Sequence, residues 1–154
     1  MHDMLVRLYA LPSLERALHT VETHGVVVKR AIACDKPAVL AWIHANFPGS
    51  VPEVETAFAQ VPANVFVALR EGRVVGFACH DVTAPNFFGP EGVDASMRGM
   101  GIGRALLLCA LHAMRAAGFA YAIVGGVGPA QFYARCVGAV PIEGSTPGLY
   151  RDRV

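Results

Sequence analysis

The sequence lacks an excess of charge of either sign. Its 154 residues include 13 Lys and Arg against 12 Asp and Glu, which leaves a formal net charge of +1. A basic surplus is typical of proteins that bind nucleic acid, and blocks of one charge are typical of disordered tails. The balance therefore predicts no nucleic-acid partner and no disordered acidic tail.

Long apolar runs and paired cysteines are also missing. No segment reaches the roughly 18 uncharged apolar residues of a membrane span, and Arg7, Glu15 and Arg16 interrupt the N-terminal stretch where a secretion signal would lie. The cysteines lack the close spacing that metal sites and redox dithiols require. They are Cys34, Cys79, Cys109 and Cys136. We therefore expect reduced, buried thiols, no metal, no membrane association and a cytoplasmic protein.

The patterning that is present predicts one α/β (α+β) domain over residues 1–154. Residues 1–24 are predicted as an N-terminal helical extension, broken at Pro12-Ser13, and residues 25–150 as the core. β-branched or alternating segments predict strands at 26–31, 65–70, 73–82, 87–94 and 121–124, with a short terminal hairpin from 139–142 and 148–150. Helices are predicted at 35–46, 53–60, 104–117 and 129–136.

Two glycine-containing segments in the middle of the chain predict a ligand site. In Arg98-Gly99-Met100-Gly101-Ile102-Gly103, three alternate glycines lead directly into a long helix. Such a loop brings the backbone close to a ligand, and the free N–H groups and positive dipole end of the helix attract an anion. The preceding strand contains Pro90, which cannot donate to a sheet ladder, so we expect a bulge there.

The predicted helix over 104–117 is apolar on most of its surface. Its polar residues, Arg104, His112 and Arg115, fall in one narrow stripe, which predicts that the remaining faces pack against a sheet. Leu108 lies in that stripe and is expected to be exposed.

The order of these elements and two motifs resemble the GCN5-related N-acetyltransferase (GNAT) superfamily. The superfamily's signature is Arg or Gln, two residues, Gly, one residue, then Gly or Ala, and it matches Arg98, Gly101 and Gly103. Phe132-Tyr133-Ala134-Arg135 looks like the superfamily's Phe-Tyr-x-Lys element. The resemblance extends from about residue 26 to residue 150. It implies a mixed, centrally splayed sheet of about six to seven strands flanked by helices.

The resemblance also implies an activity, which is transfer of an acetyl group from acetyl-CoA to a primary amine of a small molecule or peptide. The pyrophosphate of acetyl-CoA would lie on the glycine loop and the pantetheine arm along the fourth core strand, where a backbone N–H can stabilise the thioester oxyanion. The implied cofactor-binding residues are Val93, Asp94, Arg98, Gly99, Met100, Gly101, Ile102, Gly103 and Arg104.

The chemistry needs one group that protonates the departing thiolate and one that deprotonates the amine. Tyr133 matches the superfamily's general acid, and a phenol stays protonated at neutral pH. Glu91, on the strand before the loop, is the first candidate for the general base. His80 and Asp81 are further candidates whose side chains are expected on opposite faces of their strand, and water is the remaining one.

The sequence departs from the superfamily's common pattern in several places. An asparagine that often contacts the cofactor is replaced by Gly126-Val127-Gly128-Pro129. The stretch between Tyr133 and Gly138 has one extra residue. The terminal hairpin is short, and the N-terminal helix is an addition to the common pattern. We expect that helix to pack on the domain's own sheet, with a homodimer as a further hypothesis.

The spacing of the glycines argues against two other nucleotide-binding classes, and turnover of acetyl-CoA distinguishes an enzyme from a non-catalytic binding domain. Neither the Gly-x-Gly-x-x-Gly of a dinucleotide-binding domain nor the Gly-Lys-Ser/Thr of a P-loop fits the glycine segment. A non-catalytic acetyl-CoA-binding sensor or interaction domain with the same fold is the alternative function.

Overall fold

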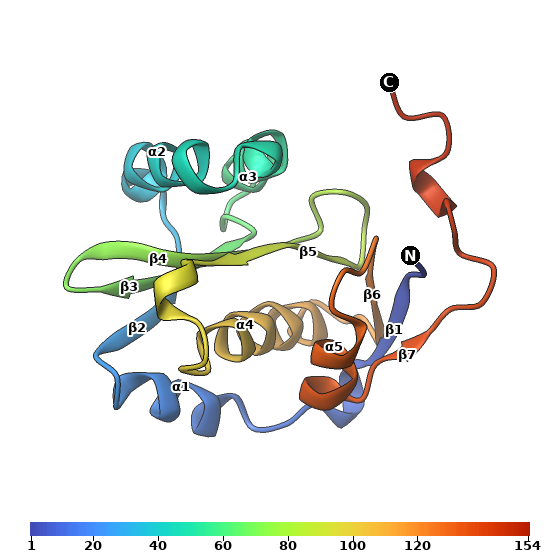
Figure 1. Cartoon of the computed structure of the whole chain (residues 1–154), viewed down its shortest axis with the longest axis horizontal. Coiled ribbons are helices and arrows are strands. Elements are labelled where there is room, and N and C mark those ends of the chain that lie inside the picture. Colours follow the sequence, from blue (N-terminus) through green and yellow to red (C-terminus); the bar gives the residue numbers. More distant parts are fainter.

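The computed structural model describes residues 1–154 and is built on one seven-stranded sheet with the order β2-β3-β4-β5-β6-β1-β7 (Figure 1). The strands are β1 (Met4–Arg7), β2 (Val26–Arg30), β3 (Val65–Arg70), β4 (Arg73–His80), β5 (Phe87–Val93), β6 (Tyr121–Val124) and β7 (Val140–Pro141). The helices are α1 (Leu14–Glu22), α2 (Lys36–Asn46), α3 (Val51–Phe58), α4 (Ile102–Ala116) and α5 (Ala130–Val137). The predicted α/β class with a mixed sheet is confirmed, because β5 and β6 pair in parallel and the other neighbours are antiparallel.

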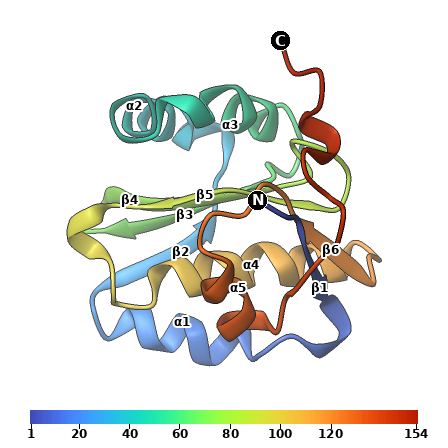
Figure 2. The same ribbon diagram turned by 45° about the vertical axis from the view of Figure 1, so that its right-hand side comes forward.

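Helices cover both faces of the sheet and give the domain three layers (Figures 1 and 2). The pair α2 and α3 lies on one face, over a core that includes Ile43, Val54 and Phe77. On the other face lie α1, α4 and α5, and the larger core there is centred on the buried side of α4. None of the helices combines the length and the apolar character needed to cross a lipid bilayer.

The sheet opens between β5 and β6. These two strands pair only at Phe87 with Ile123 and Phe88 with Val124, and the rest of β5 continues without β6 beside it. The register between β4 and β5 also shifts by one position between Ala78 and His80. The irregular strand predicted from Pro90 is therefore confirmed, and its far half borders a gap in the sheet.

The N-terminal segment differs from its prediction. The helical extension expected over residues 1–24 begins with strand β1, which lies between β6 and β7. Met4 and Val6 are buried while Arg7 is exposed, so the period of two, not the helical period, decides this stretch. The expected packing on the domain's own sheet holds in part, because α1 packs mainly on α4 and also contacts β2. Ala17 and Val21 belong to a buried cluster that includes side chains of both α4 and the sheet.

Two further predictions are corrected, one within α4 and one near the C-terminal end of the chain. Leu108 is fully buried, not exposed. It shares a side of α4 with His112, whose Nε2 lies 2.9 Å from the Pro12 carbonyl oxygen, so the N-terminal segment covers that side. The terminal hairpin is also absent, because β7 pairs with β1 and Gly148–Tyr150 forms a 3-10 turn instead of a strand.

Candidate functional site

A cavity of about 700 Å³ lies where the N-terminus of α4 approaches the free half of β5. Four separate parts of the chain contribute to it: the end of α2, strand β5, the loop leading into α4, and α5. Its lining residues are Phe47, Glu91, Gly92, Val93, Met97, Arg98, Gly99, Gly101, Ile102, Gly103, Arg104, Pro129, Phe132 and Tyr133.

The loop before α4 is shaped by two glycines with left-handed backbone angles. Gly99 has φ of 83° and Gly101 has φ of 85°, angles that side chains with a Cβ rarely adopt. The first helical hydrogen bond runs from the Ala105 N–H to the Gly101 carbonyl oxygen at 3.0 Å. The N–H groups of the three preceding residues therefore have no partner within the helix. With the helix dipole and the guanidinium groups of Arg98 and Arg104, they give this wall of the cavity a positive electrostatic character, which favours an anion.

Strand β5 presents alternate residues to the two faces of the sheet. A Cβ on Gly103 would lie 3.4 Å from Glu91 Oε1 and 3.7 Å from Val93 Cγ2, so both side chains point toward α4. A Cβ on Gly92 would lie only 2.6 Å from the Phe47 ring, which covers the opposite face. Glycine at position 92 therefore permits the close approach of Phe47 that closes this side of the cavity.

The backbone of β5 leaves a donor facing the gap. The Asp94 N–H donates to the Val75 carbonyl oxygen at 2.9 Å, and in an antiparallel ladder only every second residue bonds to the same neighbour. The N–H of Val93 therefore points away from β4, toward the opening where β6 has diverged.

Tyr133 and Glu91 meet at the inner end of the cavity. The Tyr133 hydroxyl donates to Glu91 Oε2 over 3.4 Å, and Glu91 Oε1 has no partner and no contact with solvent. Burial raises the pKa of Glu91 to about 8, against the opposing effect of the Tyr133 hydroxyl. Burial and the neighbouring carboxylate also raise the pKa of Tyr133. At neutral pH the carboxyl and the phenol therefore both hold their protons.

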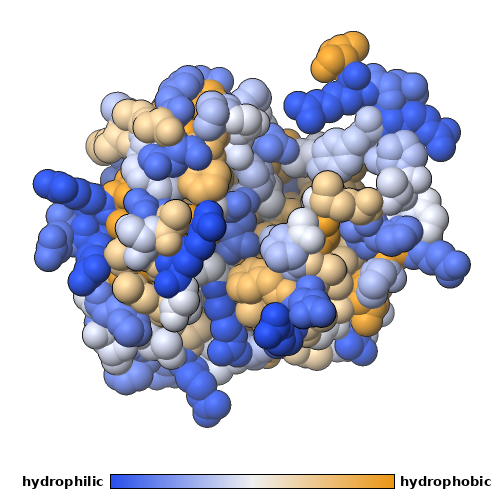
Figure 3. Space-filling model, in the orientation of Figure 1, coloured by the Kyte–Doolittle hydropathy of each residue, from blue (hydrophilic) through white to orange (hydrophobic).

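Aromatic side chains fix the position of the phenol. The Tyr133 ring packs edge-on against Phe132 at 5.0 Å between centroids and against Phe88 at 6.1 Å. On the face of the molecule drawn in Figure 3, apolar residues form several patches in the middle and hydrophilic side chains project around the margin. Gly138, with φ of 64°, ends α5 as predicted and keeps Tyr133 on the inward side of a short helix.

Two of the predicted cofactor-binding residues do not line the cavity. The Asp94 carboxylate accepts hydrogen bonds from the N–H and hydroxyl of Ser96, at 2.9 and 2.7 Å, and so caps the turn Ala95–Met97. Met100 is partly buried against the main core. The other seven predicted residues, with Tyr133 and Glu91, all line one cavity.

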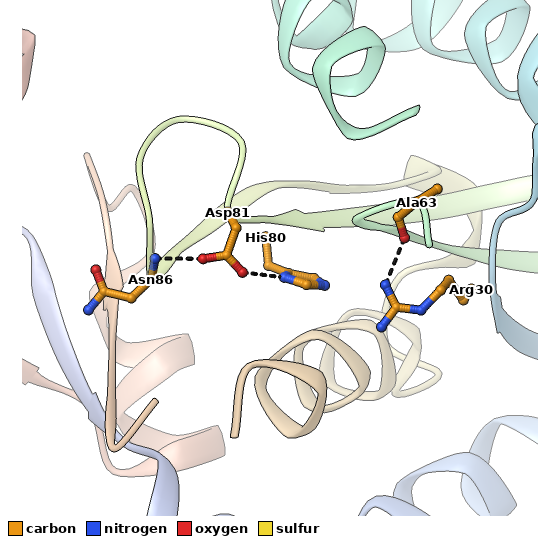
Figure 4. Close-up of polar contacts among 5 residues, drawn as sticks. All are labelled: Arg30, Ala63, His80, Asp81 and Asn86. Carbon is orange, nitrogen blue, oxygen red and sulfur yellow. Dashed lines mark hydrogen bonds and ion pairs between the residues drawn. The ribbon is translucent and has the colours of Figure 1, made fainter. Parts of the chain in front are cut away.

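His80 and Asp81 line a second cavity, to which Glu91 and Tyr133 do not contribute. Figure 4 shows the two side chains beside each other. The expectation that their side chains occupy opposite faces is wrong. Asp81 follows the end of β4 with φ of 54°, and this left-handed angle breaks the alternation of the strand. Its Oδ2 consequently lies 2.6 Å from His80 Nδ1, and neither residue reaches the first cavity.

The sequence interpretation missed several cavity residues, Gly92, Met97 and Pro129 among them. Phe47 ends α2 and contacts Gly92 from a distant part of the chain. Phe132 was recognised as part of a motif but not as a lining residue. The structure has no cluster of three or more His, Cys, Asp or Glu side chains arranged to hold a metal ion.

Comparison with known proteins identifies the family of the central part of the chain. Residues 62–136 match the family model described as "Acetyltransferase (GNAT) domain", and this stretch runs from before β3 into α5. No significant match to the chain is found among curated proteins.

Solved structures share the fold. A "GCN5-related glucosamine N-acetyltransferase region" of a fungal multi-domain β-N-acetylglucosaminidase superposes with a TM-score of 0.74 at 17% identity, over 92% of this chain and 19% of that one. A GCN5-related N-acetyltransferase from Sphaerobacter thermophilus superposes with a TM-score of 0.66 at 19% identity, over 92% of this chain and 48% of that one. A GNAT family acetyltransferase from Brucella melitensis, solved with acetyl-CoA, superposes with a TM-score of 0.54 at 22% identity, over 73% of this chain and 81% of that one. The chain thus spans less than half the length of the first two.

Proposed function

We propose that this chain, which belongs to the GCN5-related N-acetyltransferase superfamily, transfers an acetyl group from acetyl-CoA to a primary amine of a small molecule or peptide. The observation that carries the proposal is the position of two features in one cavity. The start of α4 and Tyr133 both line this cavity, together with the open edge of β5.

The residues that line the cavity suit a ligand that carries both phosphates and a thioester. The N–H groups of Ile102, Gly103 and Arg104 would hold the pyrophosphate, assisted by the charges of Arg98 and Arg104. The unpaired edge of β5 would hold the pantetheine arm by backbone hydrogen bonds. Two glycines without side chains at the loop leave room for this approach.

Acetyl-CoA supplies an acetyl group activated as a thioester. Val93 would donate its backbone N–H to the carbonyl oxygen of that group, where negative charge develops as the amine attacks. The new bond joins the amine nitrogen to the acetyl carbon, and the bond from that carbon to sulfur breaks. Tyr133 would donate its proton to the departing sulfur, a role suited to a phenol that holds its proton at neutral pH.

Glu91, which accepts a hydrogen bond from Tyr133, would act as the general base that takes the proton of the amine. The carboxyl has a pKa of about 8, so it is mostly protonated at pH 7 and can accept a proton only in its ionised minority form. A role for Glu91 as general base therefore requires activity that rises toward pH 8. Water near the acceptor amine is the other candidate for that step, and a basic limb that persists in Glu91→Gln would assign the step to water.

Replacement of Tyr133 by Phe tests the proposal. We expect Tyr133→Phe to lower kcat by about 10²–10⁴-fold, the usual contribution of a general acid, with unchanged affinity for acetyl-CoA. Tyr121→Phe is the matched control, because Tyr121 is an exposed tyrosine on β6 outside the cavity. Thiol release from acetyl-CoA would be measured with a panel of amines that includes glucosamine, because the similar fungal region is named as a glucosamine N-acetyltransferase.

Two results would contradict the proposal. Full activity of Tyr133→Phe would remove the phenol from the reaction. Calorimetric binding of acetyl-CoA without acceptor-dependent thiol release, over the whole amine panel, would favour a non-catalytic acetyl-CoA sensor with this fold.

A further inference from the structure

A second cavity, of about 570 Å³, lies at the opposite end of α4 from the loop of glycines. It is bounded by the end of β4, the segment that follows β4, the loop before β3 and the last turn of α4. It shares no lining residue with the first cavity. Its polar side chains include Asn64 and also Arg30, His80 and Asp81, which are drawn in Figure 4.

His80 is 5% exposed and has one nitrogen without a partner. Its Nδ1 lies 2.6 Å from Asp81 Oδ2, and the other carboxylate oxygen accepts the Asn86 N–H at 2.6 Å. A carboxylate can only accept, so the proton of the ring is on Nδ1. Burial lowers the pKa of His80 and outweighs the opposing effect of Asp81. The neutral ring therefore presents the lone pair of Nε2, which no group of the chain satisfies.

Arg30 supplies the opposite function on the other side of the cavity. One guanidinium nitrogen donates to the Ala63 carbonyl oxygen at 2.7 Å, and the group lies over the Phe66 ring at 4.6 Å. No carboxylate pairs with it. The same Phe66 ring packs against His80 at 6.2 Å, and the guanidinium and imidazole point toward each other above the end of α4 (Figure 4).

Three of the last carbonyl groups of α4 are already paired, which reduces the repulsion that this helix end exerts on an anion. The carbonyl groups of Ala113, Met114 and Arg115 accept hydrogen bonds from the N–H groups of the three residues that follow the helix, at 3.0 to 3.2 Å. The other walls are apolar and are formed by Pro62, Val82, Pro85, Ala113, Ala117 and Phe119.

We infer that this cavity binds an amino acid or hydroxy acid with an apolar side chain. The carboxylate pairs with the Arg30 guanidinium, the adjacent ammonium or hydroxyl donates to His80 Nε2, and the side chain lies against the apolar wall. One positive charge from Arg30 and one negative charge from Asp81 suit a monocarboxylate better than a phosphate dianion. A simple carboxylate leaves Nε2 unpaired, and a simple amine leaves Arg30 unpaired, so both functions are needed on one ligand.

Four probes of one carbon skeleton separate these requirements: L-leucine, 2-hydroxy-4-methylpentanoate, 4-methylpentanoate and 3-methylbutylamine. Calorimetry with the full chain should give saturable binding for the first two at concentrations up to about 10 mM, and at least about tenfold weaker binding for the last two. Acetyl-CoA is not added, so failure of this inference is distinct from failure of the proposed acetyltransferase function.

Two variants and one measurement on the unaltered protein locate the binding. Arg30→Gln and His80→Phe should each weaken L-leucine binding by about tenfold or more, whereas Arg73→Gln, on the exposed end of β4, should bind as the parent does. If either variant fails to fold, the imidazole ¹⁵N signals of His80 in the parent protein still report the contact, because hydrogen bonding to Nε2 shifts that signal. Equal binding of all four probes, absence of saturable binding, or an Nε2 signal unmoved by L-leucine would overturn the inference.

Discussion

The buried carboxyl of Glu91 should make the stability of this protein fall as the pH rises from acid to mildly alkaline. Its pKa rises from an ordinary value of 4.5 to about 8, and burial is the main cause. The folded state therefore holds a proton that the unfolded chain releases above about pH 4.5. Because the folded state binds more protons over this range, the free energy of unfolding decreases with pH until about pH 8.

The size of the effect follows from the difference between the two pKa values. Each pKa unit is worth about 1.4 kcal/mol. The proton that the carboxyl must take up on folding therefore lowers the free energy of unfolding by about 3 kcal/mol at pH 7, and the full effect above pH 8 is about 4 to 5 kcal/mol. Glu91→Gln removes the titration and keeps an oxygen that can accept from Tyr133. We expect the variant and the parent to have similar stability at pH 5 and to diverge steadily toward pH 8, with the variant the more stable.

Urea unfolding of both proteins between pH 5 and pH 9 measures this directly, because other titrating groups contribute equally to both. Glu55→Gln is the matched control, since Glu55 is an exposed glutamate on α3 without a hydrogen bond or ion pair of its side chain. Parallel stability profiles of the parent and Glu91→Gln across the whole range would refute the buried, protonated carboxyl.

Two further predictions concern packing and backbone. Leu108→Ala should lower the free energy of unfolding by about 3 to 5 kcal/mol, since the side chain is fully buried. The control Leu149→Ala, at a position that is 46% exposed, should change it by less than about 1 kcal/mol. Equal losses of the two variants in urea titrations would argue against the cover of α4 by the N-terminal segment. Gly101→Ala should lower the free energy of unfolding by about 1 to 2 kcal/mol and weaken acetyl-CoA binding, because φ is 85° at this position. Gly49→Ala is the control, since Gly49 has neither a left-handed angle nor a close neighbour. Wild-type binding and stability of Gly101→Ala would contradict the role of the loop.

Much of the fold could be predicted because its signals are local. The strands around Val65 to Val82, the glycine loop and the helix that follows it have strong periodicity or turn residues, and their existence is confirmed. The segment Met4–Arg7 was assigned to a helix because four residues provide too little periodicity to distinguish a strand from the start of the helix after it. Its sheet neighbours, β6 and β7, are more than a hundred residues away, so only long-range pairing decides its conformation.

The same division applies to the site. Arg98, the glycines of the loop and Tyr133 line one cavity, and motifs indicated them in advance because a glycine loop before a helix and a family element have fixed local spacing. Leu108 was placed on the exposed stripe because a helical wheel shows polarity but not what covers it. The wrong expectation for His80 and Asp81 has a similar origin, since alternation along a strand is assumed until a left-handed residue interrupts it.

By itself, the sequence determined where anion-binding donors and a protonated phenol occur along the chain, because glycine conformation, helix ends and side-chain chemistry are local properties. Only the tertiary structure decided that Glu91 is buried against Tyr133 and holds its proton, and that His80 is left with an unpaired nitrogen opposite Arg30. Burial and pairing depend on segments far apart in the chain, and it is the loss of water around a charged or polar group that changes its chemistry.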